Sequence, residues 1–256
     1  MMTKGFRILG SCLTERRLVD WPLAFEAYCG CDGRARVDTE AYLSAFTYGD
    51  DFAGYLSTTG STRGFDGVCW GPWLWFDIDR DPAVGGIDAA LVDACRLAGA
   101  LSDHYGVPQK VQLWFYSGSK GFHCGIPTAL WCPEPSVDFH RIARRLAETM
   151  ADTAGVAIDT AVYDKVRAFR APNSRHPKTG RHKRHLSVDE LAQSASAILE
   201  AADSPVAFNP PAPPAQKVGL LEAKWDQCRQ QVRGQAQSTA HGRAAMDQGL
   251  ARLNRA

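Results

Sequence analysis

Long apolar runs are missing from this sequence, because no stretch approaches the roughly 20 residues that a membrane-spanning helix requires. Polar and charged residues follow the start within a few positions, too soon for the apolar region of a signal peptide. An internal repeat is also missing. We therefore expect an ordinary globular protein of the cytoplasm that has no membrane partner.

Paired cysteine motifs are scarce as well. Eight cysteines are scattered along 256 residues, and the one close pair, Cys29 and Cys31, has neither a second pair nor a nearby histidine. Structural zinc sites usually take four ligands from paired motifs. A chain of this size with 45% apolar residues also needs no disulfides to stabilise its core. The cysteines are therefore expected to be reduced thiols that bind no zinc.

Net charge is nearly absent, at +1, but the charge is unevenly distributed. Residues 165–184 contain eight Lys or Arg residues and no acidic residue. A block of one sign attracts polyanions, so this segment suits phosphate groups. The alternative is a basic loop that is simply solvated.

The strand predicted over residues 73–79 carries the first chemical signal. Its even-numbered residues 74, 76 and 78 are apolar and share one face, and Trp73, Trp75, Asp77 and Asp79 share the other. We expect the first face to pack and the second to carry chemistry. Before this strand, residues 1–65 mix short apolar runs with Gly, Ser and Thr and are interpreted as an α+β segment.

Further elements follow from the spacing of apolar residues. Helical spacing predicts helices over residues 87–105 and 136–152, and two shorter apolar runs predict strands over 111–116 and 122–126. A Ser-x-x-Glu capping box then begins a helix predicted over residues 187–201.

The C-terminal part has a different composition. Five prolines between residues 205 and 214 predict a stiff, extended linker. Beyond it, residues 218–235 predict an amphipathic helix that would dock onto the core or onto a partner. Its apolar residues lie three or four apart: Leu221, Trp225, Cys228 and Val232.

Asp77 and Asp79 lie two apart on the predicted strand, so both carboxylates project from one face and could share hard divalent cations such as Mg²⁺ or Mn²⁺. The strand before them is rich in aromatic residues. Two charges at the end of a buried strand are costly without a partner ion. Solvated aspartates in a turn are the alternative interpretation.

A Gly-, Ser- and Lys-rich connection over residues 116–123 joins two predicted strands. Glycines let backbone amides approach an anion closely, and hydroxyl and ammonium groups add donors for phosphate oxygens. The spacing differs from the GxxxxGK[ST] pattern of P-loop proteins. His123 begins the outgoing strand and is a candidate donor to a phosphate or sugar oxygen. A satisfied structural histidine is the alternative.

The third candidate segment spans residues 158–181. It holds a dense set of donors suited to a triphosphate or a nucleic-acid backbone: Arg167, Arg170, Ser174, His176 and Lys178. Asp159, after an apolar stretch, is the expected third carboxylate, and Asp164 is the competing candidate.

These three segments, in this order and at these separations, resemble the archaeo-eukaryotic primase superfamily. Residues 76–79 resemble its DxD motif, and residues 114–124 resemble its serine-glycine loop that ends in histidine. Asp159 and the basic stretch after it resemble the third motif. The resemblance covers roughly residues 66–187, and three ordered motifs are much more specific than one. No zinc knuckle accompanies them, so the resemblance is to the catalytic module.

The resemblance implies an α/β fold of the α+β kind, with an RRM-like, mostly antiparallel sheet that has helices on one face and the three aspartates on the open face. The expected catalytic domain is residues 1–204, divided into an N-terminal subdomain over 1–65 and the RRM-like module over 66–204. A linker over 205–216 and a helical tail over 217–256 would follow.

By the same resemblance, Asp77, Asp79 and Asp159 would form the catalytic triad and bind two Mg²⁺ or Mn²⁺ ions. A larger set would bind the incoming nucleotide: Ser117, Ser119, Lys120, Gly121, His123, Arg167, Arg170, Ser174, His176 and Lys178. The remaining basic residues, with Trp73 and Trp75, would track and stack on a single-stranded template.

The implied function is a template-dependent nucleotidyltransferase, a DNA primase or primase-polymerase that makes primers on single-stranded DNA from NTPs or dNTPs. Its partners would be nucleoside triphosphates, the template, and a replicative helicase or other replication proteins. Ser119 and Lys120 resemble the polymerase domain of bacterial end-joining ligases more closely, whereas residues 176–181 resemble primases. The alternatives are a repair or end-joining polymerase, a non-catalytic replication initiator and a metal-dependent nuclease.

Overall fold

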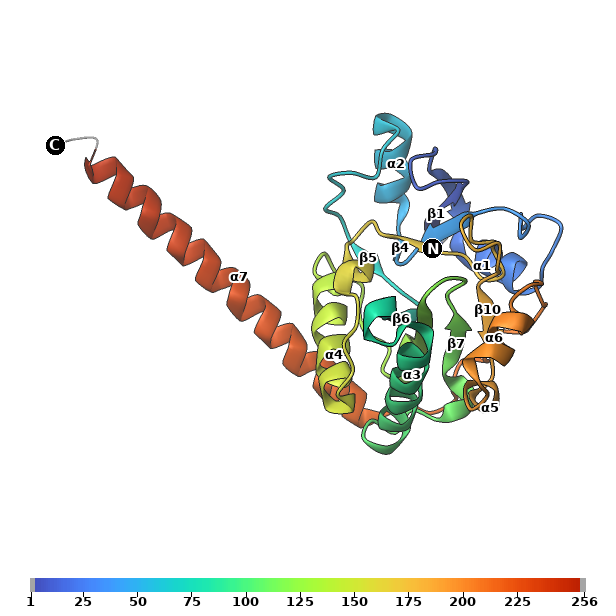
Figure 1. The fold of residues 1–256 in the computed structure, drawn as a ribbon. Coiled ribbons are helices and arrows are strands. Elements are labelled where there is room, and N and C mark those ends of the chain that lie inside the picture. Colours follow the sequence, from blue (N-terminus) through green and yellow to red (C-terminus); the bar gives the residue numbers. More distant parts are fainter. Residues whose placement is uncertain (1–2, 254–256) are drawn as a thin grey trace.

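Two antiparallel β-sheets with flanking helices make up the fold (Figure 1), which confirms the expected α+β class. The computed structural model describes residues 3–253, and the side chains of residues 3–238. The first sheet has the order β5-β4-β1-β3-β9, and β2 also pairs with β1. Its strands are β1 (Lys4–Leu9), β2 (Arg17–Asp20), β3 (Ala41–Ser44), β4 (Thr47–Tyr48), β5 (Cys69–Trp70) and β9 (Ala168–Arg170).

Helices α1 (Trp21–Cys29) and α2 (Asp50–Thr59) accompany the first sheet, as expected for the N-terminal α+β segment. The Asp20 carboxylate caps α1 by accepting a hydrogen bond from the Leu23 amide at 3.2 Å. Two strands of this sheet, β5 and β9, come from beyond residue 65. The sheet therefore joins distant parts of the chain, and the domain boundaries stay a prediction.

The second sheet has the order β10-β7-β8-β6. Its strands are β6 (Trp73–Asp79), β7 (Leu113–Tyr116), β8 (Gly121–Pro127) and β10 (Arg184–Leu186). The chain leaves β6 through α3 (Gly86–Asp103) and enters β7 two strands away, so β8 fills the gap of a split β-α-β unit. Helix α4 (Phe139–Ala154) packs beside α3 against this sheet (Figure 1).

Most predicted elements of the second sheet are confirmed within a few residues. The strand predicted from residue 111 begins at Leu113 because a 3₁₀ turn precedes it. Helix α4 begins later than predicted because Ser136 instead forms a two-way backbone bridge with Cys69. The short 3₁₀ helices are η1 (Pro82–Val84), η2 (Gln109–Val111), η3 (Thr128–Leu130) and η4 (Thr160–Tyr163).

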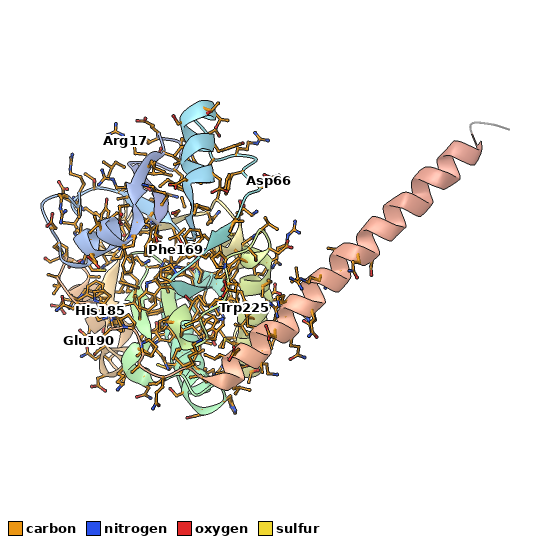
Figure 2. The ribbon with its side chains drawn as sticks, turned by 180° about the vertical axis from the view of Figure 1, so that it is seen from behind. Arg17, Asp66, Phe169, His185, Glu190 and Trp225 are labelled. Carbon is orange, nitrogen blue, oxygen red and sulfur yellow. The ribbon has the colours of Figure 1, made fainter. Side chains whose placement is uncertain are left out.

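Half of the face of β6 that was expected to be open is buried. Trp73 and Trp75 are only 7% and 4% exposed. The Trp75 ring packs 5.2 Å from Phe169 of β9 and 6.4 Å from Phe25 of α1, measured between ring centroids. Figure 2 shows Phe169 in the interior of the molecule. The prediction that both tryptophans stack on a template is therefore wrong.

The helix predicted over residues 187–201 is two helices, α5 (Val188–Leu191) and α6 (Ala195–Ala201). The capping box is confirmed, since Ser187 and Glu190 exchange both hydrogen bonds. The prediction of a continuous helix is wrong because Ser194 caps a second one, its hydroxyl accepting from the Ala197 amide at 3.3 Å.

The proline-rich segment has no regular secondary structure over residues 205–216, yet it is attached to the body of the protein. Asn173 and Val206 exchange two hydrogen bonds of 3.1 Å through the Asn173 side chain. The Phe208 ring stacks on His185 at 4.2 Å between centroids. These contacts fix the segment along the sheet, and we call residues 205–216 the strap.

Helix α7 (Gly219–Leu253) is longer than the predicted 218–235. Its predicted apolar residues Leu221, Trp225, Cys228 and Val232 are all buried. The Trp225 ring packs against Phe139 of α4, 4.9 Å between ring centroids. Of the two expected docking sites, this part of α7 therefore uses the core of the protein. Figure 1 shows the rest of α7 extending away from the body.

Two expectations about the whole chain can be compared with the structure. All eight cysteines are free thiols, as expected. Within residues 3–253, none of the helices combines the length and the apolar character that crossing a bilayer would take.

Candidate active site

The two aspartates of β6 lie on the part of the strand beyond the buried tryptophans. In the β6–β8 register, Asp77 is opposite His123 and Asp79 is opposite Gly121. The aspartate side chains are 16% and 28% exposed. A Cβ atom at position 121 would overlap the Ile78 carbonyl and the Asp79 carboxylate. Glycine at this position therefore lets the Ser-Gly loop end directly against the acidic pair.

Asp77 and Asp79 have opposite electrostatic environments. Burial acts to raise the pKa of Asp77, but the neighbouring His123 side chain and the basic residues Lys183 and Arg167 outweigh it, and the pKa is lowered. The pKa of Asp79 is raised by burial and by the negative charge of Asp77, against the opposing effect of Lys120. Asp77 is thus the stably ionised member of the pair.

His123 faces Asp77, with Nε2 3.4 Å from Oδ1. Its ring is buried against Phe169, 4.4 Å between centroids. Burial and the Lys183 charge lower the pKa of His123, although Asp77 acts to raise it. The imidazole is therefore neutral at neutral pH and can donate from one nitrogen only.

Asp159 lies beside the pair in the fold, although it is 80 residues or more away in sequence. Its backbone N–H donates to the Asp77 carbonyl at 2.8 Å, across the edge of β6. Its exposed carboxylate caps η4 by accepting from the Ala161 amide at 2.8 Å. The competing candidate Asp164 is an exposed residue at the other end of η4. The structure therefore brings Asp159, rather than Asp164, to the backbone of Asp77.

The Ser-Gly loop is a tight connection between β7 and β8. The Ser117 hydroxyl accepts from the amides of Ser119 and Gly121 at 3.3 Å each. Gly118 has a positive φ of 89°, a conformation that favours glycine. At the end of the loop, the exposed Lys120 ammonium lies 3.1 Å from the Asp79 carboxylate. The loop thus points a cation at the acidic pair.

The third motif folds back onto this loop. Residues 176–181 form a turn in which the His176 amide donates to the Arg181 carbonyl at 2.7 Å. The Thr179 hydroxyl donates to the Gly118 carbonyl at 2.5 Å. His176 Nδ1 faces the amides of Lys178 and Thr179 at 3.3 and 3.4 Å. Second and third motifs therefore form one surface.

The predicted nucleotide-binding residues differ in availability. Arg167 and Lys178 are exposed. Arg170 is mostly buried and donates to the Tyr42 hydroxyl at 3.1 Å. Ser174 is fully buried, and its hydroxyl donates to the Ala41 and Ala171 carbonyls. The structure therefore places Ser174 beneath the surface of the candidate site.

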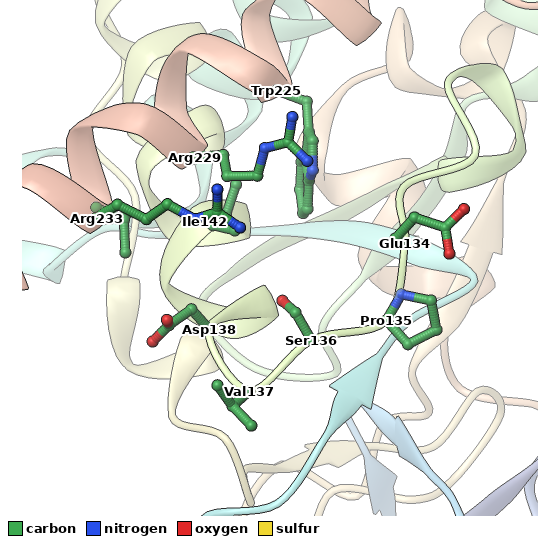
Figure 3. Close-up of a pocket in the computed structure, with 10 residues that line it drawn as sticks. Glu134, Pro135, Ser136, Val137, Asp138, Ile142, Trp225, Arg229 and Arg233 are labelled. Carbon is green, nitrogen blue, oxygen red and sulfur yellow. The ribbon is translucent and has the colours of Figure 1, made fainter.

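Two cavities lie away from the acidic pair. Figure 3 shows one of about 230 Å³ between α7 and the loop before α4, where Arg229 and Arg233 face Glu134 and Asp138 across the opening. Another, of about 560 Å³, is lined largely by aromatic residues and by prolines of the strap. Neither includes any of the three candidate carboxylates.

Residues 76–188 match the family of DNA primase small subunits. The matched segment begins inside β6 and ends at the start of α5, so it contains all three motifs. The matched family is a member of the archaeo-eukaryotic primase superfamily. No curated protein sequence matches the chain.

The match to this family supports a primase-like nucleotidyltransferase. It implies nucleotide substrates and a single-stranded DNA template. Primases of this family generally use divalent metal ions. In the part of the chain that the structure describes, no group of three or more His, Cys, Asp or Glu residues is arranged to hold a metal ion.

The acidic pair nevertheless fits a cation chemically. Asp77 Oδ1 is buried; His123 Nε2 lies 3.4 Å away, and no hydrogen bond to this oxygen forms among the described residues. A buried carboxylate oxygen without a hydrogen bond is costly, and the pKa of Asp79 is raised by burial and by repulsion from Asp77. A divalent cation between them would relieve both penalties. The donor set of Asp77 and Asp79, with Asp159 beside them, therefore fits Mg²⁺ or Mn²⁺.

Sequence reasoning missed a buried lysine beneath the site. Lys183 is 1% exposed, and its ammonium donates to the Arg170 carbonyl at 2.8 Å. The ammonium also lies over three rings, 4.2 Å from the centroid of Phe169 and farther from Phe115 and Trp75. The alternative of a solvated basic loop is wrong for this residue. Nothing in a run of eight cations distinguishes the two that are buried, Lys183 and Lys165.

Proposed function

We propose that this protein is a template-dependent DNA primase or primase-polymerase that makes primers on single-stranded DNA from NTPs or dNTPs. The observation that supports it best is the hydrogen bond from the Asp159 amide to the Asp77 carbonyl. This contact holds the backbone of Asp159 against the strand that carries Asp77 and Asp79, which supports Asp159 as the third carboxylate, next to a loop rich in phosphate donors. The proposal includes a cytoplasmic location and contacts with replication proteins such as a helicase.

Asp77, Asp79 and Asp159 would hold the divalent ions, which supply Lewis acidity for attack of a 3′-hydroxyl on the α-phosphate and for departure of pyrophosphate. The Asp159 side chain must leave its cap on Ala161 to take part. Asp77 is suited to be the permanent ligand because its pKa is lowered and its Oδ1 accepts no hydrogen bond from the described residues.

The basic residues around the pair would bind the triphosphate. Lys120 is 58% exposed and pairs with Asp79, so an incoming triphosphate offers its ammonium a more negative partner. Arg167 and Lys178 are exposed on the same motif surface. Neutral His123 would donate one hydrogen bond to a phosphate or sugar oxygen. Ser119 and His176 would contribute polar contacts at the edge of the loop.

A repair or end-joining polymerase is the second candidate, and the Ser119-Lys120 version of the loop favours it. The two functions differ in one property. A primase joins two nucleotides on an unprimed template, whereas a repair polymerase needs an existing 3′ end.

To test the proposal, the protein is incubated with labelled NTPs or dNTPs, Mg²⁺ or Mn²⁺, and either unprimed or primed single-stranded DNA. The products are sized on a gel. We expect short products on the unprimed template. Asp79→Asn should abolish them, whereas Asp81→Asn should not, because Asp81 caps η1 two residues beyond the pair. Products on the primed template alone would establish the second candidate. No product with any combination would contradict both.

A further inference from the structure

A partly buried arginine next to the acidic pair contacts three segments of the candidate site. Arg80 follows Asp79 directly, and its Nη1 donates to the Asp79 carbonyl at 2.7 Å. Nη2 donates to the Ala157 carbonyl at 3.0 Å. Nε and Nη2 also reach the Asp93 carboxylate of α3, at 2.7 and 2.5 Å. One guanidinium thus joins the end of β6, α3 and the loop before Asp159.

The loop before Asp159 is therefore held at two points. Ala157, two residues earlier, accepts from Arg80, and the Asp159 amide donates to Asp77. Asp93 anchors the arginine from a buried position on α3, and the Arg80 and Asp93 side chains are 17% and 12% exposed. A fork of N–H donors can serve all these acceptors at once, which an ammonium cannot do.

We propose that Arg80 is a positioning residue that holds the Asp159 loop against the end of β6 and so keeps the third carboxylate within reach of the other two. The inference rests on the proposed function, because it takes Asp77, Asp79 and Asp159 to be the metal ligands. Residues that orient metal ligands typically change metal affinity about 10- to 100-fold when they are removed. A purely structural ion pair would change overall stability without selectively freeing this loop.

Three variants separate the positioning role from general stabilisation. Arg80→Met removes every donor, and Arg80→Lys keeps the charge opposite Asp93 but loses the fork. Arg96→Met is the matched control, because Arg96 pairs with the same Asp93 carboxylate at 3.3 Å and is 60% exposed. If Arg80→Met fails to fold, Arg80→Lys decides the question.

The first measurement is amide hydrogen exchange of Asp159 in the metal-free protein, with the Cys124 amide of β8 as an internal reference for global unfolding. We expect exchange at Asp159 to be at least about 10-fold faster in both Arg80 variants, with Cys124 unchanged. Arg96→Met should leave both amides unchanged. Equal protection of Asp159 in all three variants would overturn the inference.

The second measurement is Mn²⁺ binding to the same proteins without nucleotide. We expect the Kd to rise about 10- to 100-fold in the Arg80 variants and to stay constant in Arg96→Met. An unchanged Kd in a folded Arg80 variant would also overturn the positioning role. If the wild-type protein binds no Mn²⁺ and makes no primers, the proposed function fails, and the exchange measurement still decides whether Arg80 holds the loop.

Discussion

One face of β6 is buried along its first half and partly exposed along its second half. Trp73 and Trp75 are buried, whereas Asp77 and Asp79, on the same face and two residues further along, remain partly exposed. The alternation of the strand is identical in both halves. What differs is the cover, because rings of α1 and β9, Phe25 and Phe169, pack on the tryptophans.

The difference shows how the first sheet and helix α1 shape the candidate site. Phe25 of α1 and Phe169 of β9 bury the first half of the face and form a floor of aromatic rings beneath the site. Phe169 belongs to this floor and also contacts His123, which pairs with Asp77. Packing on one half of the strand therefore holds a group that serves the other half.

The largest expected effect comes from the acidic half. Asp77→Asn should lower primer synthesis by about 10⁴-fold, comparable with losing a member of a catalytic triad, because the site loses the carboxylate that is most readily ionised. Cooperative unfolding in urea should persist. Rates measured with wild type and variant at saturating nucleotide test this. A loss below about tenfold would mean that the two halves of the face do not differ as we propose.

The next effect comes from the aromatic half. Trp75→Ala should destabilise the protein by about 3–5 kcal/mol, because it leaves a cavity among packed rings. Urea denaturation measures this directly. Under conditions where the variant remains folded, its affinity for single-stranded DNA should equal that of the wild type, measured by fluorescence anisotropy. A selective loss of DNA affinity would restore the template-stacking role that the structure argues against.

Local pattern predicted β6 and its acidic end correctly because both depend on neighbours in sequence. The cover over Trp75 depends on β9, which pairs with β3 more than 120 residues away. No periodicity reveals such a pairing, since three residues, Ala168–Arg170, form the whole strand. The same limit explains Lys183 and Arg80, whose roles arise from groups that only the fold brings together.

A smaller effect is expected at the open edge of the acidic half. Lys120→Met should raise the KM for nucleotide about tenfold, because one charge-assisted contact to the triphosphate is lost. Stability should change by less than about 1 kcal/mol, since exposed ion pairs contribute little. Lys110→Met, at an exposed lysine of η2, is the control and should leave the KM unchanged. An equal KM in both variants would exclude Lys120 from the nucleotide site.

The smallest expected effect separates the two aspartates by pH in metal-free protein. The pKa of Asp79 is raised, so its ionisation costs stability above that pKa, and Asp79→Asn should raise the Tm at neutral pH. The pKa of Asp77 is lowered, so its charge adds stability above the ordinary value, and Asp77→Asn should lower the Tm at neutral pH.

Both Tm differences from the wild type should become smaller as the pH falls, and each should do so over a different pH range. The Asp79→Asn gain should shrink between the raised pKa of Asp79 and the ordinary aspartate value of 3.8, because protonation removes the buried charge and its repulsion from Asp77. The Asp77→Asn loss should shrink only below 3.8, as Asp77 itself becomes protonated. Thermal unfolding in EDTA from pH 7 to pH 3 measures both. If the two variants shift the Tm in the same direction at pH 7, the pKa values of the two carboxylates are not shifted in opposite directions.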